Sequence, residues 1–380
     1  MNIIFLHSSS DLYGASKILL ITVTALKKEG HDCVVILPEK GILVDQFKKI
    51  GVKTIIFDLG VIRRKYFNIP GVLNRSYHFI KAIIKIRKII ISEETDLIYT
   101  NTTAVFSGFW ASKICKKKHI WHIHEIIESP KIVANLISWH INNLKGINIV
   151  VSNPVKDFWC INQKVDNSKI RVIHNGIEPM QIRSADKDCL RNELKLSDDH
   201  TIIGMIGRIH YWKGQEFFLD IAAEIKKISE KCKFIIVGDA FPGYEYLYDS
   251  LKNKQNKLGL SEEVFFLGYR KDVPNIIKGL DIFVLPSIKP DPFPTVILEA
   301  MSGSIPVVGT GHGGVPEMIE DGKTGFLIPW NDAVQAAQII STLIENKEMR
   351  IEMGKKGRER MMLNFSIDRY EKDIQSLILE

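Results

Sequence analysis

The chain has 380 residues, more than one hydrophobic core of ordinary size accommodates, so two domains are expected. Apolar residues at 45% and charged residues at 25% are typical of a folded globular protein and exclude a disordered or fibrous chain. The net charge is +7 and the basic excess lies in the N-terminal half, which indicates either an anionic partner such as phospholipid, lipid diphosphate or nucleic acid, or a solvated basic face.

No segment has the pattern of a membrane span or a signal peptide. The apolar run 1–6 lacks a basic flank and ends at His7, and basic residues interrupt 80–91, whereas a bilayer requires about 20 mostly uncharged residues. The five cysteines show no CxxC pair and no metal-ligand spacing, so we expect reduced thiols. These features predict a cytoplasmic protein, either soluble or peripheral on the inner face of a membrane.

Short apolar runs alternate with amphipathic stretches, a pattern that predicts βαβ units and parallel sheets. Strands are expected first at 3–6, 33–37, 53–57, 97–100, 120–122, 147–151 and 171–173, and again at 201–206, 234–237, 264–267, 282–285, 305–308 and 325–328. The restart indicates two doubly wound α/β domains, 1–180 and 181–364, with their boundary in the irregular segment 175–188. The last segment, 365–380, has a helical period, and the outside of the first domain is one place for it to dock.

The segment 77–91 predicts an amphipathic helix. One stripe carries Phe79, Ile80, Ile83, Ile84 and Ile90, while Lys81, Lys85 and Lys88 lie elsewhere. We expect the apolar stripe to pack in the core. Together with Arg63-Arg64-Lys65-Tyr66-Phe67 and Lys116-Lys117-Lys118, however, the helix also suits an anionic membrane surface, where each basic residue contributes roughly 1 kcal/mol.

The first candidate site follows the strand 201–206. Gly207 ends this strand, and Arg208 and Lys213 bracket a short loop before the next helix. Ligands of open α/β sheets bind outside the carboxyl ends of the strands, so both cations are placed to clamp a diphosphate. The alternative is two ordinary surface cations.

The second candidate site follows the strand 282–285. A proline-rich loop leads to a helix expected to start at Pro294, which leaves the amides of Thr295 and Val296 available to a phosphate. Glu299 lies one turn later on the same face, where a carboxylate can accept two hydrogen bonds from a ribose diol. Asp291, on the loop, is placed to reach hydroxyls of a sugar.

These motifs resemble those of the family 4 glycosyltransferases, which have the GT-B fold of two Rossmann-like domains facing each other across a cleft. The resemblance rests on Asp291 with Glu299, on Gly207-Arg208 with Lys213-Gly214, and on Gly313-Gly314-Val315-Pro316-Glu317. It extends more weakly to Tyr13-Gly14-Ala15-Ser16-Lys17 and to Trp121-His122-Ile123-His124-Glu125, which are similar to the glycine-rich and histidine loops of the family.

The resemblance implies a role for each matching residue. His124, Arg208, Lys213 and Asp291 are the expected catalytic residues. The donor is expected to contact Gly14, Gly207, Arg208, Lys213, Phe293, Thr295, Val296 and Glu299. The sequence departs from the family at Asp291, where glutamate is usual, and at Pro294, where glycine is usual. Both departures bear on the geometry around the sugar.

The resemblance further implies a hexosyltransferase that retains the anomeric configuration and uses neither a metal nor a cofactor. The donor is expected to be a UDP-sugar, with GDP-mannose next, and the acceptor a glycan or a lipid-linked sugar in bacterial surface polysaccharide synthesis. Nucleic acid is not an expected partner. The Asp186-Lys187-Asp188 sequence would suggest a metal site, but it follows no apolar strand and is better interpreted as helix N-terminal charge.

Two other functions compete with this interpretation. One is a catalytically weak partner subunit that only binds a nucleotide sugar. The other is a dehydrogenase, which the sequence disfavours because no strand leads into a G-x-G-x-x-G turn with an acidic residue about 20 positions later.

Overall fold

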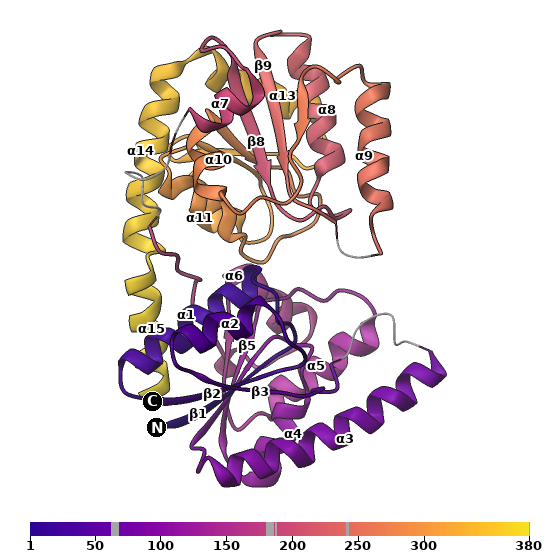
Figure 1. Cartoon of the computed structure of the whole chain (residues 1–380), viewed down its shortest axis with the longest axis vertical. Coiled ribbons are helices and arrows are strands. Elements are labelled where there is room, and N and C mark those ends of the chain that lie inside the picture. Colours follow the sequence, from indigo (N-terminus) through magenta and orange to yellow (C-terminus); the bar gives the residue numbers. More distant parts are fainter. Residues whose placement is uncertain (62–67, 180–185, 187, 241–242, 380) are drawn as a thin grey trace. The chain divides into compact units, whose positions relative to one another are not determined.

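The computed structural model describes residues 1–61, 68–179, 186, 188–240 and 243–379 (Figure 1). Within them the chain forms two compact units, one of Met1–Gly176 with Ile367–Glu380 and one of Ile177–Ser366. The units therefore divide after Gly176 and Ser366, a few residues from the boundaries expected at 180 and 364. None of the described helices combines the length and the apolar character needed to cross a bilayer.

The first unit is built on a parallel sheet with the strand order β3-β2-β1-β4-β5-β6-β7. Its strands are β1 (Asn2–His7), β2 (Asp32–Leu37), β3 (Lys53–Ile56), β4 (Leu97–Asn101), β5 (Lys118–Ile123), β6 (Gly146–Val150) and β7 (Ile170–Val172). Its helices are α1 (Gly14–Lys28), α2 (Ile42–Lys49), α3 (Ile69–Ser92), α4 (Ser107–Cys115), α5 (Lys131–Asn143), α6 (Asn153–Asp157), the π-helix η2 (Phe158–Asn162), the 3-10 helix η3 (Asn167–Lys169) and α15 (Ile367–Leu379).

The second unit repeats this plan with the strand order β10-β9-β8-β11-β12-β13, again all parallel. Its strands are β8 (Thr201–Ile206), β9 (Cys232–Val237), β10 (Val264–Phe266), β11 (Ile282–Leu285), β12 (Val307–Thr310) and β13 (Gly325–Ile328). Its helices are α7 (Cys189–Leu194), α8 (Gln215–Lys226), α9 (Tyr246–Lys257), α10 (Val273–Gly279), α11 (Thr295–Ser302), α12 (Val315–Met318), α13 (Ala333–Glu345) and α14 (Lys347–Asn364). The two predicted series of strands are therefore present, with ends shifted by at most a few residues.

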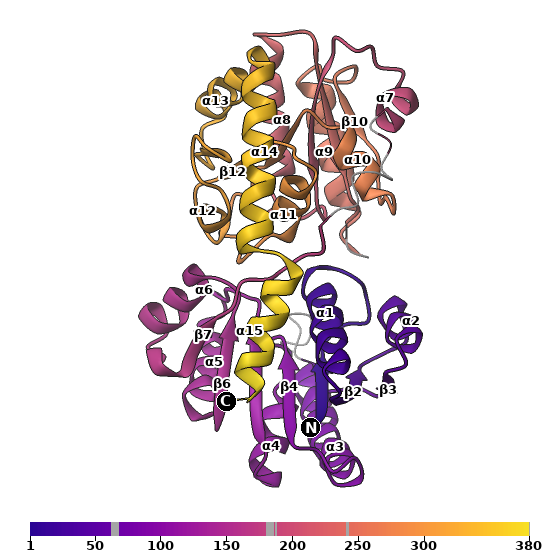
Figure 2. The same ribbon diagram turned by 90° about the vertical axis from the view of Figure 1, so that its left-hand side faces the viewer.

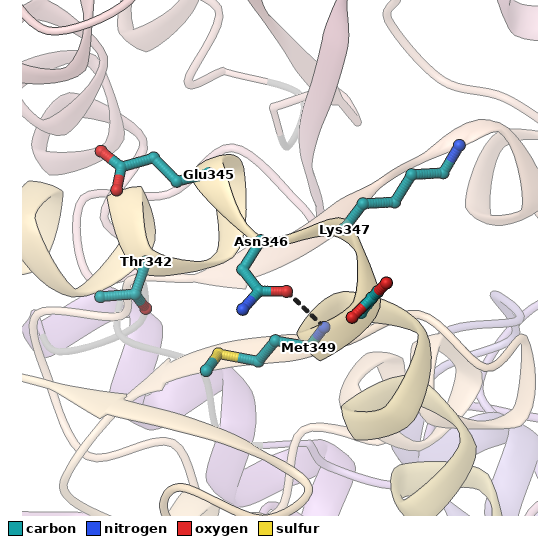
Figure 3. A pocket seen from close by; sticks show the side chains of 6 residues that line it. Thr342, Glu345, Asn346, Lys347 and Met349 are labelled. Atoms are coloured by element: carbon teal, nitrogen blue, oxygen red, sulfur yellow. Dashed lines mark hydrogen bonds between the residues drawn. The ribbon is translucent and has the colours of Figure 1, made fainter.

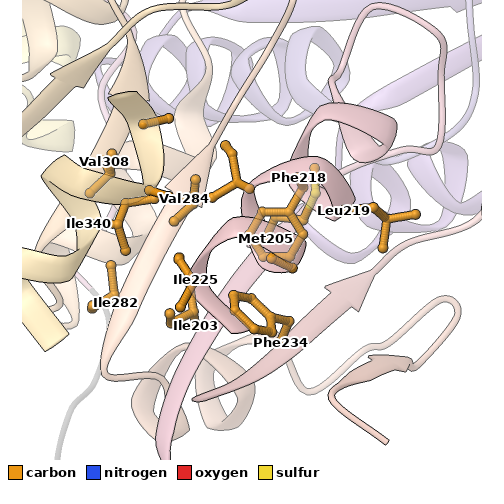
Figure 4. Packing of buried hydrophobic residues seen from close by; sticks show 14 of the residues in the cluster. Ile203, Met205, Phe218, Leu219, Ile225, Phe234, Ile282, Val284, Val308 and Ile340 are labelled. Atoms are coloured by element: carbon orange, nitrogen blue, oxygen red, sulfur yellow. The ribbon is translucent and has the colours of Figure 1, made fainter. Parts of the chain in front are cut away.

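Each sheet is covered on both faces, which explains why its strands are continuously apolar. In β1, Ile3 and Phe5 contribute to one core cluster, whereas Ile4 and Leu6 contribute to another. Figure 4 shows the corresponding core of the second unit, where Phe218 of α8 and Ile340 of α13 pack on strand residues such as Met205.

The C-terminal helix α15 belongs to the first unit and lies beside α1 (Figure 2). It buries Tyr370, Ile374, Leu377 and Ile378 in the cluster that also contains residues of α1 and β1. The Tyr370 hydroxyl is 2.6 Å from Thr22 Oγ1 of α1, so the ring is fixed by a hydrogen bond as well as by packing.

The helical segment formed by α13 and α14 is divided at Asn346, which ends α13 and caps α14. Its side-chain oxygen accepts a hydrogen bond of 2.9 Å from the Met349 amide (Figure 3). The pocket drawn there is lined by Thr342, Glu345, Asn346, Lys347, Glu348 and Met349, none of which is a predicted site residue.

The core-packing prediction for 77–91 is wrong for Ile80 and Ile84, which are 59% and 53% exposed. Ile90 is buried as expected, and Ala82 and Ile86 are buried with it against the sheet. Periodicity could not separate the two faces because both carry isoleucines. The neighbouring basic segment 63–67 lies outside the described residues.

Helix α14 allows a matched test of packing at two of its glycines. A Cβ added at Gly354 would lie 2.0 Å from the Ser304 carbonyl oxygen, whereas one at Gly357 would meet nothing closer than 3.4 Å. Gly354→Ala should therefore cost about 2 kcal/mol of unfolding free energy through overpacking. Gly357→Ala should be neutral or stabilise by up to about 1 kcal/mol through helix propensity. Urea unfolding measures both, and equal effects would contradict the packing described.

The first unit should lose stability in acid because it buries neutral histidines. Burial lowers the pKa of both His119 and His122 to about 3, whereas an unfolded histidine has a pKa near 6.5. The unfolded chain therefore binds more protons between these values, so the unfolding free energy falls as the pH drops from 6.5 towards 3.

His119→Gln should remove one of these titrating groups while a polar side chain remains beside Thr100 Oγ1, which is 2.8 Å from His119 Nε2. The slope of unfolding free energy against pH should decrease by about 1.4 kcal/mol per pH unit in urea titrations between pH 6 and pH 4. An unchanged slope would show that His119 is not kept neutral by the fold.

Candidate functional site

In the second unit the strand order reverses between β8 and β11, and ligands of α/β sheets bind outside the strand ends at such a point. Three segments follow neighbouring strands there: 207–214 after β8, 286–294 after β11 and 311–314 after β12. We call them the three strand-end loops. They contain all the predicted site residues of this unit except those on helix α11.

The first two strand-end loops are in direct contact. The Ile288 amide donates a hydrogen bond of 2.9 Å to the Trp212 carbonyl. Gly214 has a φ of +79°, and a Cβ there would lie 1.8 Å from the Pro286 carbonyl oxygen, so only glycine fits. Gly207 differs, because a Cβ there would meet nothing within 4 Å. None of the described residues requires a glycine at the end of β8, and the open space beside it leaves room for a ligand.

Lys213 and Asp291 form an ion pair between these two loops. Lys213 Nζ donates a hydrogen bond of 2.5 Å to Asp291 Oδ2, and the side chains are only 22% and 13% exposed. The Ser287 hydroxyl lies 3.4 Å from the same carboxylate oxygen. Arg208 is half-buried on the same loop as Lys213, and its carbonyl accepts a hydrogen bond of 2.9 Å from Gln215 Nε2. The structure thus joins Lys213, which was predicted to bind the diphosphate, to Asp291, which was predicted to reach the sugar.

Helix α11 begins at Thr295, one residue later than expected. Pro294 has an extended ψ of 99° and occupies the N-cap position. The amides of Thr295 and Val296 belong to the first turn, where no residue of the helix can accept from them. Thr295, Val296 and Glu299 are all half-buried at this helix end.

The side chain of Phe293, a predicted donor contact, lies in the core. Its side chain is 5% exposed, and its ring packs against Phe365 with the centroids 5.7 Å apart. The ring therefore contributes to the core of the second unit, and any donor contact of Phe293 would have to come from its backbone.

The third strand-end loop packs on the backbone of the second. A Cβ at Gly313 would lie 2.4 Å from the Asp291 carbonyl oxygen, and Gly313 has a φ of +61°. The Gly314 amide donates a hydrogen bond of 2.8 Å to the same carbonyl. Thr310 Oγ1 donates another of 2.8 Å to the Ser287 carbonyl. The two glycines of the predicted motif therefore fix the position of the loop that carries Asp291.

In the first unit, His124 follows β5 and is held by Asn101 at the end of β4. Asn101 Nδ2 donates to the Ala15 carbonyl at 3.0 Å, so Asn101 Oδ1 is an acceptor, and His124 Nε2 lies 2.9 Å from it. Burial lowers the pKa of His124 well below its usual value. The ring is therefore neutral with its proton on Nε2, and Nδ1 is left as an acceptor.

His122 differs from His124 although the two rings lie side by side with centroids 4.0 Å apart. His122 is fully buried, and its Nδ1 lies 2.7 Å from the Tyr99 hydroxyl in the core. Its position is explained by packing, and His124 is the better candidate for contact with a ligand.

Glu125 fixes the loop that carries His124. Its carboxylate accepts hydrogen bonds from the His124 amide at 3.0 Å and from Thr102 Oγ1 at 2.5 Å. Burial raises the pKa of Glu125, and these hydrogen bonds oppose that shift. Glu125 therefore links the chain after β5 to the chain after β4.

Gly14 is the first residue of α1, and a Cβ there would meet nothing within 4 Å, as at Gly207. The predicted loop after β1 therefore leads directly into a helix N-terminus.

Asp188 immediately precedes α7, which agrees with its interpretation as charge at a helix N-terminus. Lys187 lies outside the described residues.

Sequence reasoning missed several residues that organise these sites. Asn101 and Ser287 are ordinary polar residues after apolar strands, and no motif distinguishes them. His312 immediately precedes the Gly313-Gly314 pair of the predicted motif. This position on the third strand-end loop is the signal that could have marked it as a site residue.

Comparison with known families agrees with this geometry. Residues 13–181 match the family described as Glycosyltransferase Family 4, and residues 186–360 match Glycosyl transferases group 1. Among solved structures, HepE of Anabaena in complex with UDP and glucose has a TM-score of 0.87 and 25% sequence identity, covering 100% of this chain and 99% of that one.

Two curated relatives align over nearly their whole length. The UDP-Gal:alpha-D-GlcNAc-diphosphoundecaprenol alpha-1,3-galactosyltransferase of Escherichia coli is 25% identical over 97% of this chain and 94% of its own. The N,N'-diacetylbacillosaminyl-diphospho-undecaprenol alpha-1,3-N-acetylgalactosaminyltransferase of Campylobacter jejuni is 24% identical over 93% and 92%. The two Rossmann-like sheets, the motifs on their strand ends and these matches together show that the chain is an enzyme of glycosyltransferase family 4 with the GT-B fold.

Proposed function

We propose that the enzyme transfers a sugar from a UDP-sugar to a lipid-linked glycan, with retention of anomeric configuration, in bacterial surface polysaccharide synthesis. The observation that carries this proposal is the contact between the loop after β8, which holds Lys213, and the loop after β11, which leads into the N-terminus of α11 and to Glu299. The names of the Escherichia coli and Campylobacter jejuni relatives, both of which act on diphosphoundecaprenol-linked sugars, support the acceptor class. The Escherichia coli name and the UDP bound to HepE support the donor.

The donor's diphosphate would bind Arg208, Lys213 and the amides at the start of α11. Arginine offers a planar fork and lysine a compact charge, and a helix N-terminus adds unpaired N–H groups and a favourable dipole. Glu299 would accept hydrogen bonds from the two ribose hydroxyls. Because Lys213 also donates a hydrogen bond to Asp291, the donor phosphate would compete with that carboxylate for the ammonium group.

In the proposed reaction the bond between the sugar's anomeric carbon and the diphosphate oxygen breaks through an oxocarbenium-like transition state. The acceptor hydroxyl oxygen bonds to the same carbon on the same face, and its proton passes to the departing diphosphate. Arg208 and Lys213 stabilise the charge that grows on the leaving oxygen. These groups supply the positive charge without a metal. In this proposal the acceptor Nδ1 of neutral His124 would accept a hydrogen bond from a sugar hydroxyl.

We further propose that the first unit binds an anionic membrane surface through α3, where a lipid-linked acceptor would be found. The exposed side chains Leu73, Tyr77, Ile80, Ile84 and Ile91 recur at helical spacing and therefore form one stripe. This stripe lies opposite the buried Ala82, Ile86 and Ile90. Lys81, Lys85 and Lys88 are also exposed on the helix. An apolar face bordered by lysines is typical of helices that lie in a bilayer interface.

Side chains on the neighbouring helices also suit contact with an anionic membrane surface. Helix α4 packs against α3 and exposes Trp110, which stacks on the exposed Trp139 of α5 with the centroids 6.2 Å apart. Lys113 lies over the Trp139 ring at 5.5 Å. Tryptophan and lysine are both favoured where a protein meets the headgroup region.

Glu299→Ala should lower kcat/KM for the UDP-sugar by roughly 100-fold, since two hydrogen bonds between a carboxylate and the ribose are lost. The assay is UDP release in the presence of lipid-linked acceptor, with circular dichroism to verify folding. Glu345→Ala, at the remote α13–α14 junction, is the matched control and should retain full activity. Near-normal turnover of the Glu299 variant would contradict the proposed donor site.

Ile80→Asp combined with Ile84→Asp should reduce flotation with vesicles of phosphatidylglycerol and phosphatidylethanolamine by at least about tenfold at low salt. The fold should be unaffected because both side chains are exposed. Ile228→Asp combined with Ile351→Asp makes the same change at exposed sites of the second unit and should leave flotation unchanged. A wild-type chain that does not float, or equal losses in both variants, would contradict membrane binding through α3.

A further inference from the structure

We propose that His312 binds a hydroxyl group of the sugar carried by the donor, an assignment that rests on the function proposed above. Both ring nitrogens of His312 are buried, and among the described residues neither has a partner in good hydrogen-bond geometry. The Ser287 carbonyl is near enough to act on the ring but lies outside that geometry. A buried polar atom left without a partner costs about 1–3 kcal/mol. Native proteins rarely keep such atoms without a functional reason.

The other buried histidines show that this arrangement is unusual within the described chain. His119, His122 and His140 each have one ring nitrogen near a partner: the hydroxyl of Thr100, the hydroxyl of Tyr99 and the carbonyl of Leu136, respectively. Only their second nitrogen is unsatisfied. His312 has neither nitrogen in a well-formed hydrogen bond with the described residues, so its imidazole is less fully satisfied within the protein than the other three.

The position of His312 places it beside the loop that carries Asp291. Its neighbours on both sides are tied to the second strand-end loop, through Thr310 Oγ1 on the Ser287 carbonyl and through the Gly314 amide on the Asp291 carbonyl. The negative charge of Asp291 is close enough to act on the ring. A ligand that reaches Asp291 therefore also reaches the region of His312.

The chemistry of the ring favours a hydroxyl over a phosphate. Burial lowers the pKa of His312, although the Ser287 carbonyl and the Asp291 carboxylate oppose this shift. The neutral imidazole that results has one N–H donor and one nitrogen acceptor. A sugar hydroxyl can both donate and accept, whereas an ionised phosphate only accepts. The site that Asp291 and His312 form together suits the sugar, and the diphosphate is left to Arg208, Lys213 and the start of α11.

The test compares the binding of UDP with that of UDP-galactose and UDP-glucose by calorimetry, in the full chain and in His312→Phe. Phenylalanine keeps a planar ring but removes both nitrogens. The Kd of UDP should change less than about twofold, whereas the Kd of the better-bound UDP-sugar should rise about five- to tenfold. The thermal midpoint of the free variant should be unchanged or raised, because two unsatisfied buried atoms disappear.

His312→Gln, which keeps a donor and an acceptor, is the second variant and should recover part of the discrimination between UDP-sugar and UDP. Equal losses for UDP and UDP-sugar would overturn the assignment by showing that the ring serves the nucleotide. Unchanged Kd values for UDP and the UDP-sugars in a folded His312→Phe variant would overturn the role assigned to His312 and leave the proposed donor standing. A wild-type chain that binds neither UDP nor UDP-sugar would refute the proposed donor, and this assignment with it.

Discussion

The site of the second unit depends on one constraint, which is the close approach of Gly313 and Gly314 to the backbone of Asp291 and Pro292. A side chain at either glycine would lie less than 2.5 Å from a carbonyl oxygen of that segment. Glycine is therefore required to bring the loop after β12 against the loop after β11. Gly214 plays the same part where the loop after β8 meets Pro286. Loops that begin on three neighbouring strands are thereby held as one surface.

This arrangement explains how Lys213 and Asp291 come to share a hydrogen bond although they are far apart in the sequence. Two partly buried opposite charges lower each other's cost of desolvation. When a diphosphate replaces the Asp291 carboxylate as the partner of Lys213, the free energy of the ion pair is lost. The other contacts between the donor and the protein must offset that loss. In the proposed site those contacts come from Arg208, the start of α11 and Glu299, and the displaced Asp291 becomes available to the sugar.

The sequence predicts the fold well because parallel strands covered on both faces are continuously apolar, and their ends coincide with glycine or polar residues. It also predicts Lys213 on the loop after β8, and Thr295 and Glu299 on the helix that follows β11, since local order fixes these positions. It does not predict the pairing of Lys213 with Asp291 or the support of His124 by Asn101, which depend on contacts between distant segments. It misplaces Ile80 and Ile84 because α3 is apolar on two faces, and it misses His312 because a single histidine before two glycines carries no period or spacing.

The most direct test of the central claim is a crystal structure of the chain with UDP bound. The diphosphate should lie at the amides of Thr295 and Val296, with Lys213 Nζ within hydrogen-bonding distance of a phosphate oxygen. The Glu299 carboxylate should accept hydrogen bonds from the ribose hydroxyls. UDP bound elsewhere, or bound without contact to Lys213 and Glu299, would refute this donor site.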